Sequence, residues 1–169
     1  GSKNINLFSF VEFCLWNAQD DMLNYQRNLN TGEVEIDGNT IYHKTEYRER
    51  RNHYAFYSVN TQISGFDTDR DTFLGAFNGL DNPDSVINGS SGNSVASGWY
   101  PIASHRIDIS LNAGESCEYI FVLGYIENEN DEKFESLNVI NKTKAKKMIA
   151  RYESSAQCDA ELDKLKSYW

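Results

Sequence analysis

Alternating apolar positions near the start of the chain predict a buried β-strand over Ile5–Trp16. One face of this strand carries Leu7, Val11, Phe13 and Leu15, and the other carries Phe8, Phe10, Cys14 and Trp16. A strand that is apolar on both faces is typical of the centre of a sheet covered on both sides. We therefore expect a neighbouring strand on each of its edges, supplied in part by earlier strands of a longer polypeptide.

Shorter apolar runs separated by turn residues predict a mainly antiparallel β fold. The predicted strands are Glu33–Asp37, Thr40–Lys44, His53–Asn60, Arg106–Leu111 and Glu118–Glu127. The first two flank Asp37-Gly38-Asn39, a hairpin signature, and Ala113-Gly114 marks a turn between the last two. The Gly-, Asn-, Asp- and Ser-rich stretch Ser64–Gly98 predicts long loops with one short strand at Phe73–Phe77.

Helical spacing replaces the two-residue alternation after Asn128. Residues 129–140 read as an acidic connector, and a helix is predicted from Asn141, its expected N-cap. A second apolar stripe after Ser154-Ser155 consists of Cys158, Leu162, Leu165 and Trp169. The four lysines Lys142, Lys144, Lys146 and Lys147 are expected to form a solvated face. The second helix shows no stop signal, so we expect it to continue in a longer polypeptide.

The pattern divides the chain into three parts. Residues 3–128 are predicted to form a β-sandwich portion, residues 129–140 a connector and residues 141–169 a pair of helices. We find no internal repeat.

Composition and charge exclude some classes of binding partner and indicate the cellular compartment. Acidic residues outnumber basic ones by 25 to 16, and the net charge of −9 argues against a nucleic-acid or anionic membrane surface. The apolar run Ile5–Trp16 contains Glu12 and is too short to span a bilayer. Three widely spaced cysteines, Cys14, Cys117 and Cys158, form no CxxC pair and indicate a reduced, cytoplasmic compartment.

Metal-binding and catalytic motifs are incomplete. Asp67-Thr68-Asp69-Arg70-Asp71 begins like an EF-hand loop, but Thr72 and Asn78 stand where that loop needs Gly and Glu. A loop held by Asx-type hydrogen bonds is therefore favoured. His43, His53 and His105 make a metal site only if the fold gathers them. We predict no metal, and no self-contained catalytic set is visible.

Two polar clusters suit a neutral, hydroxyl-rich ligand. They are Asn24–Asn28, next to Trp16–Asp21, and Thr45–Asn52. Amide and guanidinium groups supply directional hydrogen bonds, and aromatic rings stack on the apolar face of a sugar. The structural alternative is that arginines of the second cluster pair with Glu46 and Glu49 to hold loops together, which the alternating charges favour there. For the first cluster, ligand binding and structural support are equally consistent with the sequence.

At these residues the sequence closely resembles glycoside hydrolase family 94, the cellobiose-phosphorylase family. The resemblance rests on Phe8–Asp21, Tyr25–Glu35, Ile41–Val59, Ser64–Leu74 and Phe121–Asn128, and it extends over nearly the whole chain. It implies part of an antiparallel supersandwich of the galactose-mutarotase type, followed by linker helices and then an (α/α)6 barrel. It also implies that phosphate, the co-substrate, attacks cellobiose with inversion to give α-glucose 1-phosphate and glucose, without a cofactor.

The resemblance also implies roles for particular residues. The aspartate that protonates the leaving oxygen belongs to the barrel, so no catalytic residue is assigned in this chain, which is expected to be inactive alone. A sandwich loop reaches the acceptor sugar in this family, and Gln26 and Arg27, with Asn28 adjacent, match it. Weaker candidates are Tyr47, Arg48 and Arg50. The family further implies a homodimer, while a free-standing carbohydrate-binding module and a purely structural scaffold are the alternatives.

Overall fold

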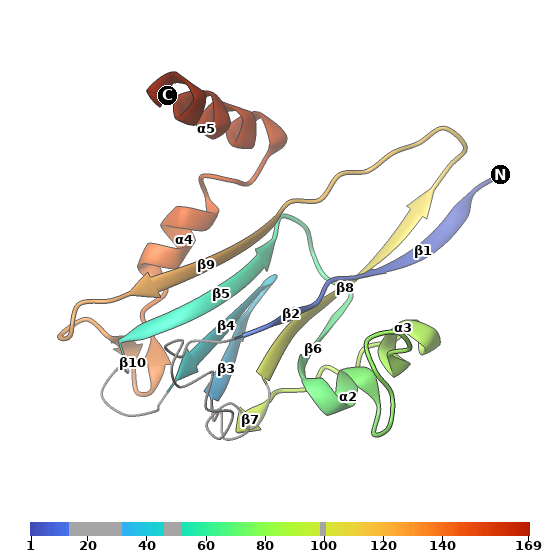
Figure 1. The fold of residues 1–169 in the computed structure, drawn as a ribbon, viewed down its shortest axis with the longest axis horizontal. Helices are drawn as coiled ribbons and strands as arrows, with labels where there is room; N and C mark the ends of the chain where they lie inside the picture. Colours follow the sequence, from blue (N-terminus) through green and yellow to red (C-terminus); the bar gives the residue numbers. More distant parts are fainter. Residues whose placement is uncertain (14–31, 46–51, 99–100) are drawn as a thin grey trace.

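The computed structural model describes residues 1–13, 32–45, 52–98 and 101–169. These residues form two antiparallel sheets that pack face to face, with helices on the outer faces (Figure 1). The predicted fold class, a mainly β antiparallel sandwich followed by C-terminal helices, is confirmed.

The first sheet has five strands in the order β7-β3-β4-β5-β9. Their bounds are β7 Ser97–Gly98, β3 Gly32–Asp37, β4 Thr40–Thr45, β5 His53–Val59 and β9 Phe121–Glu127. The predicted hairpin joins β3 and β4, because Asp37 pairs with Thr40 and Gly38 takes the positive φ of 61° that a tight turn requires.

The second sheet is built on β8, an 11-residue strand from Pro101 to Leu111. β1 (Lys3–Phe8) and β2 (Val11–Glu12) pair with one side of β8, and β6 (Gly65–Asp69) pairs with the other. The sheet is therefore three strands wide where β2, β8 and β6 lie together.

The predicted strand Ile5–Trp16 is interrupted at Ser9. The Ser9 hydroxyl accepts a hydrogen bond of 3.0 Å from the backbone N–H of His105, so a side chain takes the place of a ladder bond between β1 and β2. Only the part from Phe8 to Phe13 is covered on both faces, where Val11 and Phe13 pack in the core between the sheets and Phe8 and Phe10 pack against Phe73. Ile5 is 43% exposed, and Cys14–Trp16 lie outside the described residues. The strand is not central among the described residues, since β8 is its neighbour on one edge and no described strand pairs with the other edge.

The core between the sheets is apolar and largely aromatic. Its buried members are Phe13, Val34, Ile41, Ala55, Tyr57, Ala96 and Ala103. A second cluster lies on the opposite face of the first sheet, where Tyr42, Tyr54 and Phe56 pack against Ala145. A third lies on the outer face of the second sheet, where Phe73 and Leu74 pack against Ile102. The two sheets are thus the inner layers of a four-layer arrangement.

Two short helices cover the outer face of the second sheet: α2 (Arg70–Leu74) and α3 (Asp84–Asn88). The predicted strand at Phe73–Phe77 is wrong, because Asp69 accepts a hydrogen bond from the Thr72 N–H at 2.7 Å and starts a helix there. That helix turns Phe73 toward Phe8 and Phe10 of the second sheet. The stretch predicted as loops thus holds β6, β7 and both helices.

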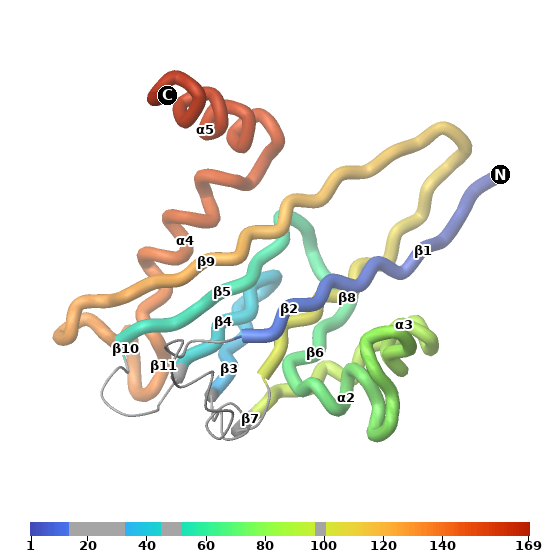
Figure 2. Tube along the Cα trace, in the orientation of Figure 1, coloured from blue at the N-terminus to red at the C-terminus, as the bar shows by residue number. Residues whose placement is uncertain are grey.

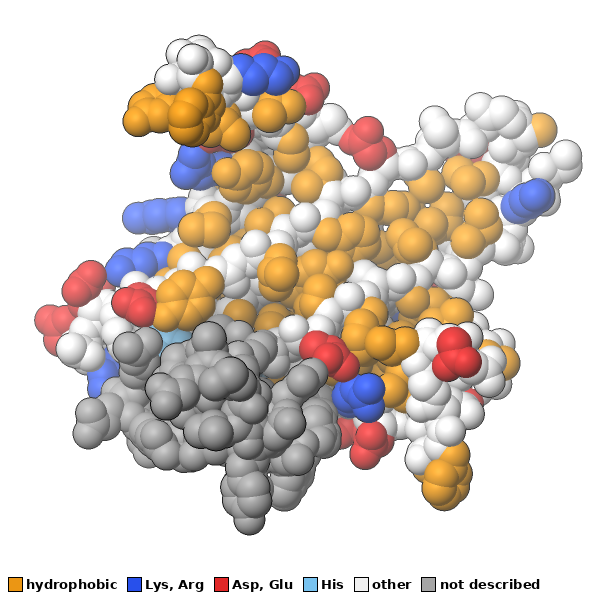
Figure 3. All heavy atoms as spheres, viewed as in Figure 1, with side chains coloured by type: hydrophobic (Ala, Val, Ile, Leu, Met, Phe, Trp, Pro, Cys, Tyr) orange, Lys and Arg blue, Asp and Glu red, His pale blue; other side chains and the backbone are white. Residues whose placement is uncertain are grey.

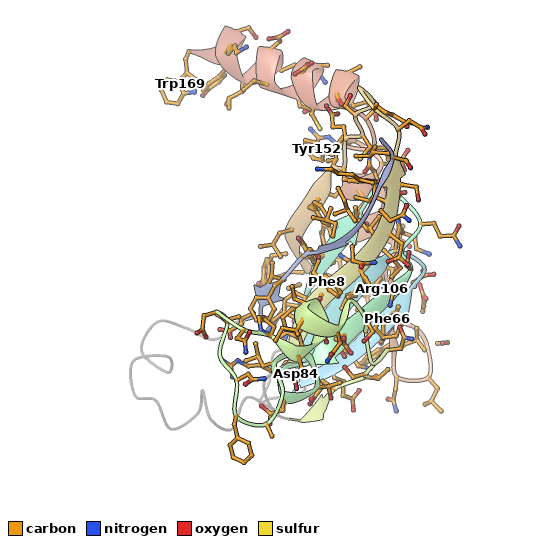
Figure 4. The ribbon with its side chains drawn as sticks, turned by 90° about the vertical axis from the view of Figure 1, so that its right-hand side faces the viewer. Phe8, Phe66, Asp84, Arg106, Tyr152 and Trp169 are labelled. Carbon is orange, nitrogen blue, oxygen red and sulfur yellow. The ribbon has the colours of Figure 1, made fainter. Side chains whose placement is uncertain are left out.

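The C-terminal part begins with the small hairpin of β10 (Phe134–Ser136) and β11 (Val139–Ile140). Helix α4 (Thr143–Ile149) then covers the first sheet, and α5 (Ser155–Tyr168) follows. The cap of α4 is Lys142 rather than Asn141, although the Asn141 side chain still accepts from the Thr143 N–H at 3.1 Å. Helix α5 buries no residue and extends away from the layers to Trp169 (Figure 4).

Within the described ranges, no helix combines the length and the apolar character needed to cross a membrane.

Candidate functional site

Several strand ends meet at one edge of the sandwich, which we call the loop edge. Gly32, the first residue of β3, pairs with Thr45 of β4 and with Gly98 of β7. Phe13, just after β2, donates its backbone N–H to the Pro101 carbonyl at 3.4 Å. Figure 2 shows the coloured ends of β3, β4 and β5 at the same side of the first sheet. The loop edge is therefore defined by Phe13, Gly32, Thr45, Gly98 and Pro101.

The residues proposed from the sequence to bind a sugar belong to segments joined to this edge. Gln26, Arg27 and Asn28 lie between Phe13 and Gly32, and Tyr47, Arg48 and Arg50 lie between Thr45 and Asn52. All six lie outside the described residues. Because the flanking strand ends are neighbours in the first and second sheets, the two segments start from adjacent positions although they are distant in sequence.

An ion pair stands beside the loop edge. The Arg70 Nε donates to the Glu12 carboxylate at 2.9 Å, and both side chains remain partly exposed. Glu12 is the last residue of β2, and Arg70 opens α2 directly after its cap Asp69. The pair therefore fixes α2 against the strand end that leads to Phe13, and it leaves both charged groups accessible to a hydroxyl-rich ligand.

The ring of Phe13 stacks on a buried histidine of the first sheet. The Phe13 ring lies on the His43 imidazole with the ring centroids 5.1 Å apart and the planes 6° apart. His43 is fully buried in β4, and neither of its ring nitrogens has a hydrogen-bond partner among the residues that the structure describes. Burial, and then the nearby His53, lower the pKa of His43 to about 3, so the imidazole is neutral at physiological pH.

A polar array on β5 and β9 extends the same end of the first sheet. The ring centroids of His53 and Tyr125 are 5.8 Å apart, and the Tyr125 hydroxyl is 2.5 Å from the Glu127 carboxylate. His53 pairs with Glu127 across the two strands, which places these three side chains in one patch. A ring, a hydroxyl and a carboxylate in this arrangement can stack on and hydrogen-bond a sugar.

The histidines do not gather into a metal centre in the described structure. His43 and His53 are close together, but His105 stacks on Tyr57 in β5, with the ring centroids 5.0 Å apart. The described residues contain no group of three or more His, Cys, Asp and Glu side chains placed to hold a metal ion.

In the EF-hand-like stretch Asp67–Asp71, the carboxylate of Asp67 is the centre of a hydrogen-bond network. Asp67 is fully buried, and its carboxylate accepts from the Gly92 N–H at 3.1 Å and from the Ser94 hydroxyl at 2.8 Å. The Ser85 hydroxyl donates to the same carboxylate at 3.3 Å. These bonds join residues distant in sequence rather than forming the predicted Asx-type loop, and they tie β6 to the chain between α3 and β7. The local Asx-type bond in this stretch is the Asp69 cap of α2.

A network of ion pairs connects the loop edge with α4. Lys44, next to the end of β4, binds Glu33 at 2.9 Å and Glu35 at 3.0 Å. Glu35 also binds Lys142 at 2.7 Å, and Lys142 binds Glu135 at 3.3 Å. The prediction that Lys142 belongs to a solvated face is wrong, because these carboxylates and the Tyr42 ring surround its ammonium group.

The pKa shifts in this network follow from the competition between burial and pairing. Burial alone would raise the pKa of Glu35, but hydrogen bonds from Lys142, the Ile140 N–H and Lys44 outweigh it and lower the pKa. Burial alone would lower the pKa of Lys44, but Glu33 and Glu35 raise it. The central groups are therefore charged at neutral pH, and β3, β4 and α4 are held together by fixed charges.

Sequence reasoning missed most of the described groups at the loop edge. Arg70, Tyr125 and Glu127 were not among the candidates, because the Asp-x-Asp-Arg stretch was interpreted as loop and Glu127 as a strand terminus. The sequence does carry a helix-start signal here, because the N-cap residue Asp69 is followed two positions later by the acidic residue Asp71. The described groups are suited to binding and orienting a ligand.

Comparison with known proteins assigns the chain to a family. Residues 1–155 match the family described as glycosyl hydrolase 94, supersandwich domain. The chain is similar to N,N'-diacetylchitobiose phosphorylase of Vibrio furnissii, with 24% identity over 169 residues that cover 99% of this chain and 19% of the relative. It is also similar to N,N'-diacetylchitobiose phosphorylase of Vibrio proteolyticus, with 26% identity over 176 aligned residues, 99% of this chain and 19% of the relative.

The chain spans about a fifth of the length of these relatives. The relatives are named for N,N'-diacetylchitobiose rather than for cellobiose, so the comparisons confirm the family predicted from the sequence and do not bear on the disaccharide of this chain. The chain belongs to the glycosyl hydrolase 94 family, whose supersandwich domain matches its first 155 residues.

Proposed function

We propose that this chain is the non-catalytic supersandwich part of an inverting disaccharide phosphorylase and that its loop edge contacts the acceptor sugar. In this proposal the catalytic aspartate and the phosphate site lie in a barrel elsewhere in the longer polypeptide. Residues 3–128 form the sandwich portion, residues 129–140 the connector and residues 141–169 the linker helices. The parent enzyme is a cytoplasmic homodimer that uses phosphate as co-substrate and needs no cofactor.

The observation that carries this proposal is the convergence of strand ends at the loop edge. The two sequence clusters suited to sugar binding are connected to neighbouring strand ends, beside the Glu12–Arg70 pair and the His53–Tyr125–Glu127 array. Donors, acceptors and aromatic rings at one edge match the requirements of a neutral sugar. The family membership supplies the reaction class.

Two disaccharides are candidate substrates. Cellobiose follows from the sequence resemblance, and N,N'-diacetylchitobiose follows from the names of the two Vibrio relatives. The test is phosphate-dependent release of sugar 1-phosphate by the natural-length polypeptide, with each disaccharide supplied separately. We expect activity with one of them and none from residues 1–169 alone. Release of sugar 1-phosphate by the 169-residue chain would overturn the proposal.

Substitutions in the first cluster test the acceptor contacts. In the natural-length enzyme, Gln26→Ala and Arg27→Ala should each remove a hydrogen bond to the sugar, which costs about 1–3 kcal/mol, or roughly 5- to 150-fold in kcat/KM for the disaccharide. The KM for phosphate should change little. Gln62→Ala, at an exposed position in the turn after β5, is the matched control.

Calorimetry separates the alternatives. A free-standing carbohydrate-binding module should bind glucose or cellobiose as the 169-residue chain, whereas a part of a shared active site should bind weakly or not at all. If Gln26→Ala and Arg27→Ala leave kcat and KM unchanged in the natural-length enzyme, the chain is a structural scaffold and the acceptor-contact proposal fails.

A further inference from the structure

A pocket of about 520 Å³ lies where the end of β9, the β10–β11 hairpin and the start of α4 meet. Asn128 after β9, Phe134 of β10 and Thr143 of α4 are three of the residues that line it. Figure 3 shows acidic and basic side chains next to one another in this region, around the end of β9 and along α4 at the left of the view. The volume lies within the range of roughly 300–1,000 Å³ that is usual for small-molecule sites, so the pocket has room for a small organic ligand.

Hydrogen bonds made by two amide side chains fix the walls of this pocket. Asn128 is 4% exposed, and its side-chain amide donates to the Asn141 carbonyl at 2.9 Å and to the Lys133 carbonyl at 3.4 Å. The Asn141 side chain donates to the Glu132 carbonyl at 3.2 Å and accepts from the Thr143 N–H at 3.1 Å. The strand end, the hairpin and the helix are therefore joined before a ligand arrives, which lowers the entropic cost of binding.

Charged side chains of both signs line the pocket without pairing with one another. Asp131, Glu132 and Lys147 all line it, and within the described ranges none of these three side chains forms a hydrogen bond or an ion pair. Lys144, the other cation of the lining, instead donates to the Glu127 carbonyl at 2.9 Å. Two carboxylates and one ammonium group are thus available to a ligand that can hydrogen-bond to both.

This lining matches a neutral ligand that both donates and accepts hydrogen bonds. Asp131 and Glu132 balance Lys144 and Lys147, so the pocket favours neither an anion such as phosphate nor a cation. Carboxylates accept hydrogen bonds from hydroxyl groups, and an ammonium group donates to them. Phe134 is 37% exposed and adds an apolar ring on which a sugar can stack.

We propose that this pocket is a second saccharide site, which holds a neutral pyranose ring through Phe134, Asp131, Glu132 and Lys147. None of these residues belongs to the two sequence clusters assigned to the acceptor sugar, so the inference goes beyond the proposed function and does not rest on it. Weak, millimolar binding is expected, because the lining offers few contacts that are buried away from water.

Lysine acetylation measures the occupancy of the pocket at a single residue. The natural-length polypeptide is treated with the N-hydroxysuccinimide ester of acetic acid in the absence of phosphate, and mass spectrometry follows the modification of Lys147. Cellobiose and N,N'-diacetylchitobiose are supplied separately. We expect at least one of them to slow the reaction of Lys147 about threefold or more, which corresponds to occupancy of about two thirds of the pockets. The control is Lys164, an exposed lysine of α5 outside the pocket, whose rate should not change.

Two substitutions in the same hairpin test whether the protection comes from the pocket. Phe134→Ala should abolish it, whereas Leu137→Ala, in the exposed turn between β10 and β11, should keep it. Equal protection in both variants would contradict the role of the Phe134 ring and overturn the site.

Other results also overturn the proposal. They are unchanged acetylation of Lys147 with both saccharides, equal slowing at Lys164, and protection by inorganic phosphate alone, which would assign the pocket to an anion. Loss of protection in Gln26→Ala would assign the effect to the acceptor contacts instead. Turnover is not measured, so failure of this site is distinguishable from failure of the phosphorylase proposal.

Discussion

At the scale of single residues, the core of this sandwich contains polar groups that are neutral or fully bonded. His105 packs against the rings of Tyr57 and Phe121, and its ring Nδ1 is 3.2 Å from the Ser9 hydroxyl. His43 is stacked on Phe13. Burial of an imidazole disfavours its charged form, so both rings link the stability of the core to pH.

Acidification should therefore destabilise the chain before its carboxylates titrate. The folded pKa is about 3 for His43 and about 4 for His105, against an ordinary value of 6.5. Because the unfolded chain binds more protons below pH 6.5, stability is complete above that pH and falls as the pH drops toward the folded values. From about pH 6 to about pH 5, each histidine should cost about 1 kcal/mol in the free energy of unfolding, measured by urea denaturation.

The variant His43→Leu provides the control for this pH dependence. It removes one of these two titrating groups and places an apolar side chain against Phe13. We expect the loss of stability over the same pH interval to shrink by about 1 kcal/mol. An unchanged pH dependence would show that His43 does not contribute.

At the scale of secondary-structure elements, charge pairing determines where α4 lies. Lys44 and Lys142 each have a side chain only 6% exposed, and both bind Glu35 of β3. A buried pair contributes little by comparison with an apolar replacement, but removal of one partner leaves charges that water cannot reach.

Glu35→Ala should lower the free energy of unfolding by about 3 kcal/mol, because two nearly buried ammonium groups lose their shared partner. Glu33→Ala is the matched control, since Glu33 is half exposed and its loss should cost less than about 1 kcal/mol. The lowered pKa of Glu35 means that the difference between the variants should be full above pH 4.5 and disappear as the pH falls through the folded value. Equal effects of the two substitutions would contradict this role for Glu35.

The elements with a strong local pattern were predictable, and those set by side-chain capping were not. The β3–β4 hairpin follows from Gly38 and the alternation around it, and β5 from its aromatic run. The helix α2 was missed because Phe73 and Leu74 resemble a strand until the Asp69 cap is considered. The burial of Lys142 was not predictable, because Glu35 lies more than one hundred residues earlier in the chain.

At the scale of the whole molecule, the layers form one body from which α5 stands apart. The helix buries no residue, and its contacts with the rest of the described chain include the surface pairs Arg151–Glu161 and Ser155–Glu118. Surface pairs of this kind contribute little to stability.

Deletion of residues 155–169 should therefore change the free energy of unfolding of the 169-residue chain by less than about 1 kcal/mol. Deletion from Thr143 onward should instead destabilise it strongly, because Ala145 would no longer cover the cluster of Tyr42, Tyr54 and Phe56. Thermal and urea unfolding of the two truncated chains provide the comparison. A large loss from the shorter deletion would show that α5 packs on the sandwich.

The sequence predicts which residue types make up the candidate site, but it does not predict where in the fold they come together. The polar clusters around Gln26 and Tyr47 have a composition that suits a sugar, although the alternating charges of the second cluster favour ion pairing. Their connection to one edge depends on pairings such as Gly32 with Gly98. Those pairings join residues far apart in sequence and carry no local signal. The binding roles of both clusters stay predictions.

The position of β8 in the chain has a consequence for synthesis on the ribosome. β1 pairs with the last six residues of β8, so Lys3 cannot pair with Leu111 until Leu111 has left the ribosome. The hairpins of β3, β4 and β5 need only local closure and can form first. During that interval β1 lacks the partner strand β8 that it has in the folded structure, so its apolar side chains stay exposed to aggregation until the eleven-residue strand is translated.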